Sequence, residues 1–132
     1  MDKDETQQML LSVIDYAQTA KPVEFRSIQN WSEYKFYRSR YKLYSLLIKA
    51  LQNSLNRLMK SYCKEVRIGV PDFNKLLAYR QIALAKMFYS QELNVLSDIL
   101  CEYEVYLSNG NFLWSFLGAP RVEENIDDFG RN

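Results

Sequence analysis

The residues with the most definable chemistry are lysines and arginines at helical spacing near the middle of the chain. Four of them recur at steps of three, four and three residues, so one helix would align them in a single stripe. A turn at Gly69-Val70-Pro71 would bring two more basic residues against this stripe. Clustered cations bind phosphate groups or an acidic protein surface, or they form a solvated face. The candidate anion- or nucleic-acid-binding residues are Arg57, Lys60, Lys64, Arg67, Lys75 and Arg80.

The formal net charge of +1 hides a polarised chain. Residues 1–30 carry −2, residues 31–67 carry +7 and residues 68–132 carry −4. The positive charge therefore gathers in the segment that holds the four aligned cations. For these four we favour a solvated face, with a site for phosphate or an acidic protein surface as the alternative.

Aromatic and basic residues also alternate closely in residues 36–42, Phe-Tyr-Arg-Ser-Arg-Tyr-Lys. Tyrosines that stack on bases and cations that contact phosphates would let such a segment bind nucleic acid. Its tyrosines also fall on a helical packing stripe, and an antiparallel neighbouring helix would place Glu104 near Lys35 and Glu102 near Arg38. For this segment we therefore favour packing and ion pairing over nucleic-acid binding.

Catalytic chemistry has little support in this sequence. It contains no histidine, which removes the usual general base, the commonest metal ligand and the imidazole of serine or cysteine triads. Cys63 and Cys101 have no partner at metal-ligand spacing, and in an antiparallel hairpin they would lie about 35 Å apart, too far for an intrasubunit disulfide. We expect both to be reduced core or boundary residues. The sequence predicts a protein that is not an enzyme, with no catalytic residue, cofactor or metal site.

Two long helices must position the basic residues. An apolar residue recurs at alternating steps of three and four between residues 34 and 62, and a second run spans residues 79–107 with Lys86 as its one break. This pattern is typical of helices that pack along their length, as in a coiled coil. Gly69 and Pro71 predict a tight connection between them. The first stripe is Tyr34, Tyr37, Tyr41, Tyr44, Ile48, Leu51, Leu55, Leu58 and Tyr62, and the second is Tyr79, Ile82, Tyr89, Leu93, Leu96, Leu100, Tyr103 and Leu107.

Shorter elements flank this hairpin. A first amphipathic helix is expected from about Asp4 to Ala20, before Lys21-Pro22 ends it. Ser108-Asn109-Gly110 predicts a turn after the third helix. A short apolar helix then follows, which would either cap the core or dock a partner or a second copy. Its candidate protein-interface residues are Phe112, Leu113, Trp114, Phe116 and Leu117.

These elements together predict an all-α protein. Its long antiparallel hairpin, at about 31–67 and 73–107, would pack with the N-terminal helix and the short C-terminal helix in a three- to four-helix bundle. Residues 1–118 would form a single helical domain, and residues 119–132 an acidic, flexible tail. No stretch approaches the ~20 apolar residues of a membrane span. No signal peptide is evident, so we expect an intracellular location, cytoplasmic or nuclear.

Two classes of function remain. The first is an assembly subunit, because long helices in a small chain expose lateral surface that a partner protein or a second copy would cover. Such a subunit would pack through its long helical stripes and its apolar C-terminal segment. The second is a small helical nucleic-acid-binding protein, such as a viral or accessory subunit of a nucleoprotein complex, that uses the basic hairpin tip. We favour the assembly subunit.

Overall fold

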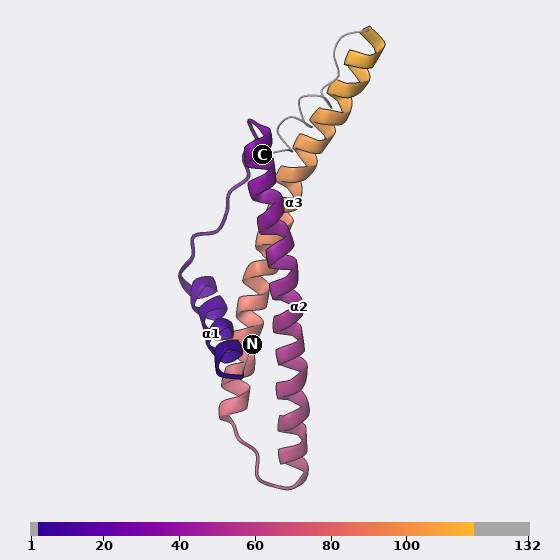
Figure 1. Ribbon diagram of the computed structural model, residues 1–132. Helices are drawn as coiled ribbons and strands as arrows, with labels where there is room; N and C mark the ends of the chain where they lie inside the picture. The colour runs from indigo at the N-terminus through magenta and orange to yellow at the C-terminus, as the bar shows by residue number, and fades with distance from the viewer. Residues whose placement is uncertain (1–2, 118–132) are drawn as a thin grey trace. The chain divides into compact units, whose positions relative to one another are not determined.

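Three α-helices are the regular elements of the computed structural model, which describes residues 3–117 and the side chains of residues 4–109. They are α1 (Lys3–Thr19), α2 (Trp31–Arg67) and α3 (Asn74–Leu117), as Figure 1 shows. The chain is arranged in two compact units. Unit 1 holds the residues up to Pro22 together with Leu43–Leu93, and unit 2 holds Val23–Lys42 together with the described residues from Asn94 onward. The predicted all-α class is confirmed.

In unit 1 the long helices α2 and α3 run antiparallel. Lys75 Nζ, early in α3, donates a hydrogen bond to Ser61 Oγ at 2.6 Å. Three turns later, Lys86 Nζ donates to Gln52 Oε1 at 2.6 Å. The residue number of the partner on α2 decreases from 61 to 52 as that of the lysine on α3 increases from 75 to 86. This confirms the predicted antiparallel hairpin. Lys86, the break in the apolar stripe, is accommodated because the amide of Gln52 satisfies its ammonium group.

Tyr89 attaches α1 to this pair of helices. Its side chain is only 1% exposed, and its hydroxyl donates to the backbone oxygen of Val13 at 2.6 Å. Its ring meets Tyr44 of α2 edge-on at 4.9 Å and stacks with Tyr16 of α1 at 6.5 Å. One aromatic side chain of α3 therefore contacts both other helices of unit 1.

The core of each unit follows the two predicted stripes. Every residue of both stripes is buried or partly buried. Leu51 in unit 1 and Leu96 in unit 2 are fully enclosed. Burial on α3 extends beyond its predicted stripe to Ala85, Glu92 and Ile99, which form a second buried row at helical spacing.

In unit 2, Tyr34 connects α2 with α3. Its hydroxyl donates to Glu104 Oε1 at 2.7 Å, and its ring lies 5.4 Å from that of Tyr103. The sequence predicted that Glu104 would lie near Lys35. The hydrogen bond instead comes from the preceding residue, so the predicted register is correct to within one residue.

The start of α2 is capped by its own sequence. Asn30 Oδ1 accepts the backbone N–H of Glu33 at 2.9 Å, which is the contact of an N-cap residue. The Glu33 carboxylate accepts a hydrogen bond from Arg26 at 3.2 Å and the backbone N–H of Gln29 at 3.4 Å. The preceding connector is thereby fastened to the first turn of the helix.

Two predictions about local structure were wrong. The turn predicted at Ser108-Asn109-Gly110 is absent, because α3 continues through it to Leu117. A helix-interior glycine costs only about 1 kcal/mol, and no proline follows it closely. Cys63 and Cys101 are free thiols, as expected, but both are exposed instead of lying in the core or at its boundary. Each follows a stripe residue directly, so its side chain is rotated about 100° away from the packed face.

Three predictions lie beyond what the structure describes. The predicted interface residues in 112–117 are part of α3, but the structure describes only their backbone and not their side chains. The predicted acidic tail, 119–132, is also outside the described residues. A single domain over residues 1–118 stays a prediction.

Candidate functional site

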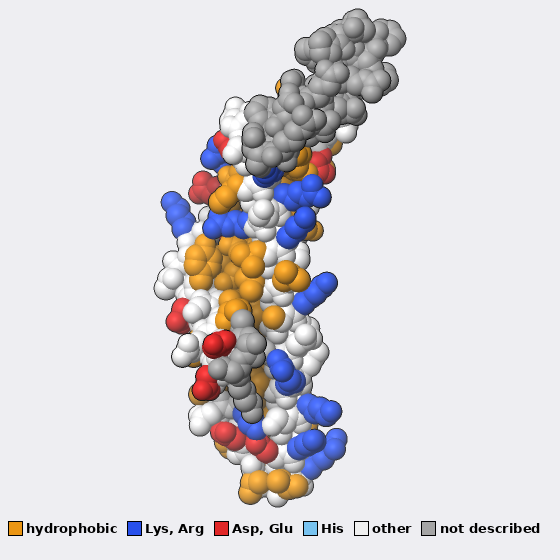
Figure 2. Space-filling model, in the orientation of Figure 1, with side chains coloured by type: hydrophobic (Ala, Val, Ile, Leu, Met, Phe, Trp, Pro, Cys, Tyr) orange, Lys and Arg blue, Asp and Glu red, His pale blue; other side chains and the backbone are white. Residues whose placement is uncertain are grey.

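The predicted basic residues all lie at the hairpin tip of unit 1, which we define as residues 57–80. Five of the six side chains are exposed: Arg57, Lys60, Lys64, Arg67 and Arg80. Among the described residues, none of these five side chains makes an ion pair or a hydrogen bond. The tip carries six basic and two acidic residues, a net charge of +4. Figure 2 shows lysine and arginine side chains along this end of α2.

Lys75 differs from the other five cations because it is already neutralised. Its ammonium group is partly buried, forms an ion pair with Glu65 and donates to Ser61. The hydrogen bond that Lys75 donates to Glu65 holds the pKa of the Glu65 carboxyl below its usual value. The backbone N–H of Asp72, which donates to the same carboxylate at 3.1 Å, lowers this pKa further. Glu65 therefore stays charged at neutral pH and fastens the loop to both helices.

The loop backbone at the tip follows a Schellman motif. Gly69 adopts φ = +78°, a left-handed conformation that favours glycine. Its N–H donates to Val66 O at 3.1 Å, and the N–H of Val70 donates to Glu65 O at 3.0 Å. Carbonyl groups in the last turn of α2 thus accept hydrogen bonds from the loop, which gives the tip a defined conformation.

Exposed apolar side chains surround this loop, and sequence reasoning missed them. Ile68 is 73% exposed, Val70 64%, Phe73 66% and Leu77 61%. Figure 2 shows apolar side chains gathered at this end of unit 1. The signal was present in the sequence, because Ile68-Gly-Val-Pro-Asp-Phe is unusually apolar for a turn. Its glycine and proline predict only the end of one helix and the start of the next.

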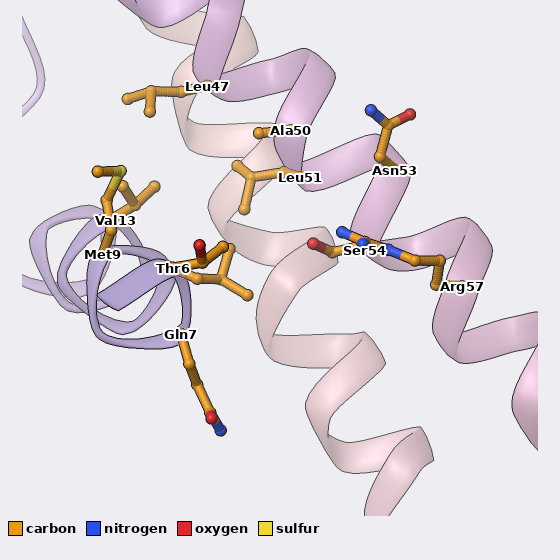
Figure 3. A pocket seen from close by; sticks show the side chains of 11 residues that line it. Thr6, Gln7, Met9, Val13, Leu47, Ala50, Leu51, Asn53, Ser54 and Arg57 are labelled. Atoms are coloured by element: carbon orange, nitrogen blue, oxygen red, sulfur yellow. The ribbon is translucent and has the colours of Figure 1, made fainter. Parts of the chain in front are cut away.

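A groove on unit 1, between α1 and α2, is the second candidate site. It encloses about 580 Å³. Figure 3 shows Met9 and Val13 of α1 on one side of the opening and Leu47 and Leu51 of α2 on the other. Arg57 is the one charged residue in the lining. The complete lining is Thr6, Gln7, Met9, Leu10, Val13, Leu47, Ala50, Leu51, Asn53, Ser54 and Arg57.

A second apolar row on α2 borders this groove. Leu43 and Leu46 are more than half exposed, and together with Leu47 and Ala50 they recur at helical spacing. The predicted core stripe is buried or partly buried within the chain, whereas this second row leaves apolar side chains of α2 exposed beside the groove.

Unit 2 holds a more polar hollow of about 460 Å³, lined by Arg38, Tyr41, Lys42, Ser97, Leu100, Cys101 and Glu104. Desolvation, together with the hydrogen bond to Glu104 and its negative charge, raises the pKa of Tyr34 to about 12. That hydroxyl therefore stays protonated as a donor at neutral pH and is unsuited to act as a general base.

Across residues 4–109, no three cysteine or carboxylate side chains gather in a group that would hold a metal ion.

Comparison with protein-family models, curated proteins and solved structures found no match to this chain. Within the described range, no helix combines the length and apolar character needed to cross a membrane. The arguments for function therefore come from the two surfaces of unit 1.

Proposed function

We propose that this protein is a non-enzymatic assembly subunit that binds an amphipathic helix of another protein in the α1–α2 groove of unit 1. The observation that carries the proposal is the apolar groove itself, bordered by exposed leucines on α2. Its α2 side extends from Leu47 to Arg57, about 15 Å, or three turns of helix. A bound helix would present apolar side chains at i, i+4 and i+7, the usual pattern of helix-in-groove recognition.

Charge favours an acidic helix as the occupant. Arg57 is exposed and has no ion-pair partner among the described residues, so a carboxylate on the bound helix would meet it. A second copy that packed α2 on α2 would instead oppose like charges, because Leu43–Arg67 holds five basic residues and one acidic residue. Self-association through this face is therefore the less favoured occupant.

The test uses a defined probe, a fluorescein-labelled helical peptide with leucines at i, i+4 and i+7 and glutamates on one flank. We expect saturable binding by fluorescence anisotropy, and weaker binding of the peptide in which lysines replace the glutamates. Ala50→Glu, an exposed site in the groove lining, should weaken binding about tenfold or more, because it buries a charge. Leu84→Glu, an exposed leucine of α3 outside the lining, is the control and should bind as the wild type does.

Light scattering on the same proteins separates the two occupants. A monomeric mass together with groove-dependent peptide binding supports the proposal. A doubled mass that Ala50→Glu abolishes would assign the groove to a second copy, and peptide binding that is unchanged in Ala50→Glu would remove the groove from consideration.

The nucleic-acid alternative has a separate basis. It depends on the five exposed cations of the hairpin tip and makes no use of the groove. It should give binding that weakens linearly in log salt, with a slope of about −0.7 to −0.9 per phosphate neutralised.

A further inference from the structure

The hairpin tip combines two properties that neither an ordinary solvated surface nor a simple phosphate site requires. Its loop and the first turns of α3 expose large apolar side chains. Its flank carries cations that form no ion pair with any residue that the structure describes. Ile68, Val70 and Phe73 are each about two-thirds exposed or more. Lys64 and Arg67 lie within the last turn of α2, immediately beside them.

Between Ile68 and Asp72 the backbone leaves no hydrogen-bond donor free. Each N–H from Ile68 to Asp72 donates to a carbonyl of the last turns of α2 or to the Glu65 carboxylate, and Pro71 has none. Phosphate-binding loops instead leave several N–H groups free to cradle the anion. Pairing of these N–H groups lowers the cost of moving the loop from water toward an apolar medium, because each unpaired polar group there costs several kcal/mol.

We propose that the hairpin tip docks on the surface of an anionic lipid bilayer. Ile68, Val70 and Phe73 enter the boundary between headgroups and acyl chains, while Lys64 and Arg67 contact the negatively charged headgroups. The tip rests on the surface and does not cross the bilayer. This surface is distinct from the α1–α2 groove, so the proposal stands independently of the proposed function.

Distance along the helices ranks the cations. Lys64 lies about 6 Å from the level of Ile68, Lys60 about 12 Å and Arg57 about 16 Å, at 1.5 Å per residue. At physiological salt the Debye length is about 8 Å, so attraction between charges that are farther apart is largely screened. Lys64 and Arg67 should therefore contribute most, each by up to about fivefold in affinity, which corresponds to about 1 kcal/mol near an anionic surface. Asp72 opposes the attraction, since it is exposed at the same tip.

The first experiment measures co-sedimentation of the full chain with vesicles of phosphatidylcholine, with and without phosphatidylserine. Binding should require phosphatidylserine and should fall as salt rises. Replacing Lys64 and Arg67 with glutamine should weaken it by about 10- to 25-fold. Phe73→Ser should weaken it by about tenfold, because burial of one large apolar side chain is lost. Leu46→Ser, an equally exposed leucine outside the tip, is the matched control and should bind as the wild type does.

The second experiment tests insertion directly. An environment-sensitive NBD label on Val70→Cys, with Cys63 and Cys101 replaced by serine, should shift to the blue when phosphatidylserine vesicles are added. The same label on Leu46→Cys should not shift. Since Val70, Phe73 and Leu46 are all exposed, these variants should keep the helical circular dichroism spectrum and the melting temperature of the parent protein.

Three results would overturn the proposal. One is the absence of binding to phosphatidylserine vesicles at low salt. Another is vesicle binding that is lost with Lys64 and Arg67 but unchanged in Phe73→Ser, which means charge attraction without insertion. The third is tight binding of a single-stranded oligonucleotide, insensitive to Phe73→Ser, with weaker binding to vesicles, which would assign the tip to nucleic acid.

Discussion

Replacing Tyr89 with phenylalanine tests how α1 is held in unit 1. The change keeps the ring and removes the hydroxyl that donates to Val13 O at 2.6 Å. That oxygen also belongs to a helical backbone, which has its own hydrogen-bonding ladder. The carbonyl is therefore not left fully unsatisfied, and we expect a loss of about 0.5–1.5 kcal/mol at neutral pH.

High pH should reverse this effect. Burial, and to a lesser extent the nearby Tyr16, raises the pKa of Tyr89 from 10.0 to about 12. A raised pKa means that the folded state favours the protonated hydroxyl, so its contribution is complete below pH 10 and is lost as the pH rises toward about 12. The full shift corresponds to about 3 kcal/mol, about half of which is lost at pH ~11. Phenylalanine has no group to ionise.

The stability difference between the wild type and Tyr89→Phe should therefore fall to zero near about pH 11 and change sign above it. Urea unfolding followed by circular dichroism, over a pH series from neutral to about pH 12, measures this directly. Tyr106→Phe, at an exposed position, is the control and should show no crossing. A difference that stays constant across the series would mean that the Tyr89 hydroxyl ionises as freely as in the unfolded chain, which would refute its burial between the helices.

Three further predictions concern packing in the two units. Leu51→Ala should cost about 2–5 kcal/mol in urea unfolding, whereas Leu46→Ala, an exposed site, should stay within about 0.5 kcal/mol; equal losses would mean the wrong face of α2 is packed. Tyr34→Phe should destabilise unit 2 by about 1–3 kcal/mol, since it removes a donor to a carboxylate, and thermal melts with no shift would contradict that hydrogen bond. Arg38→Cys should form a disulfide with native Cys101 under mild oxidation when the other native cysteine is serine, because both positions line one hollow of unit 2; failure to crosslink would disprove the register there.

The sequence alone determined the presence of the three helices and the main packed stripe on α2 and α3. Residues that recur at steps of three and four, such as those in the stripe from Tyr34 through Leu51, lie on one face of a helix. When these residues are apolar, that face is the one that becomes buried, so the prediction agrees with the structure. The sequence also predicted the tight connection between α2 and α3, since Gly69 favours the left-handed conformation that ends α2. Charge pattern and turn position together gave the antiparallel register to within one residue, as the hydrogen bond from Tyr34 to Glu104 shows.

Local signals failed where several weak preferences compete. Ser108-Asn109-Gly110 reads as a turn, but helix on both sides of it outweighs a penalty of about 1 kcal/mol. Cysteine is usually buried, yet position relative to the helical face decides exposure at Cys63 and Cys101. In both cases the type of residue was a poorer guide than its place in the longer pattern.

Only the tertiary structure decided which surfaces are left over. Periodicity shows that a face is apolar but not whether another part of the chain covers it. The position of α1 leaves a groove beside Leu47 and Ala50, and Glu65 fastens the loop so that Phe73 and its neighbours point into solvent. Likewise, only the structure shows that Lys75 is neutralised by Glu65, whereas the other five basic side chains of the tip are exposed. These outcomes depend on contacts between residues far apart in the chain, which spacing along the sequence does not encode.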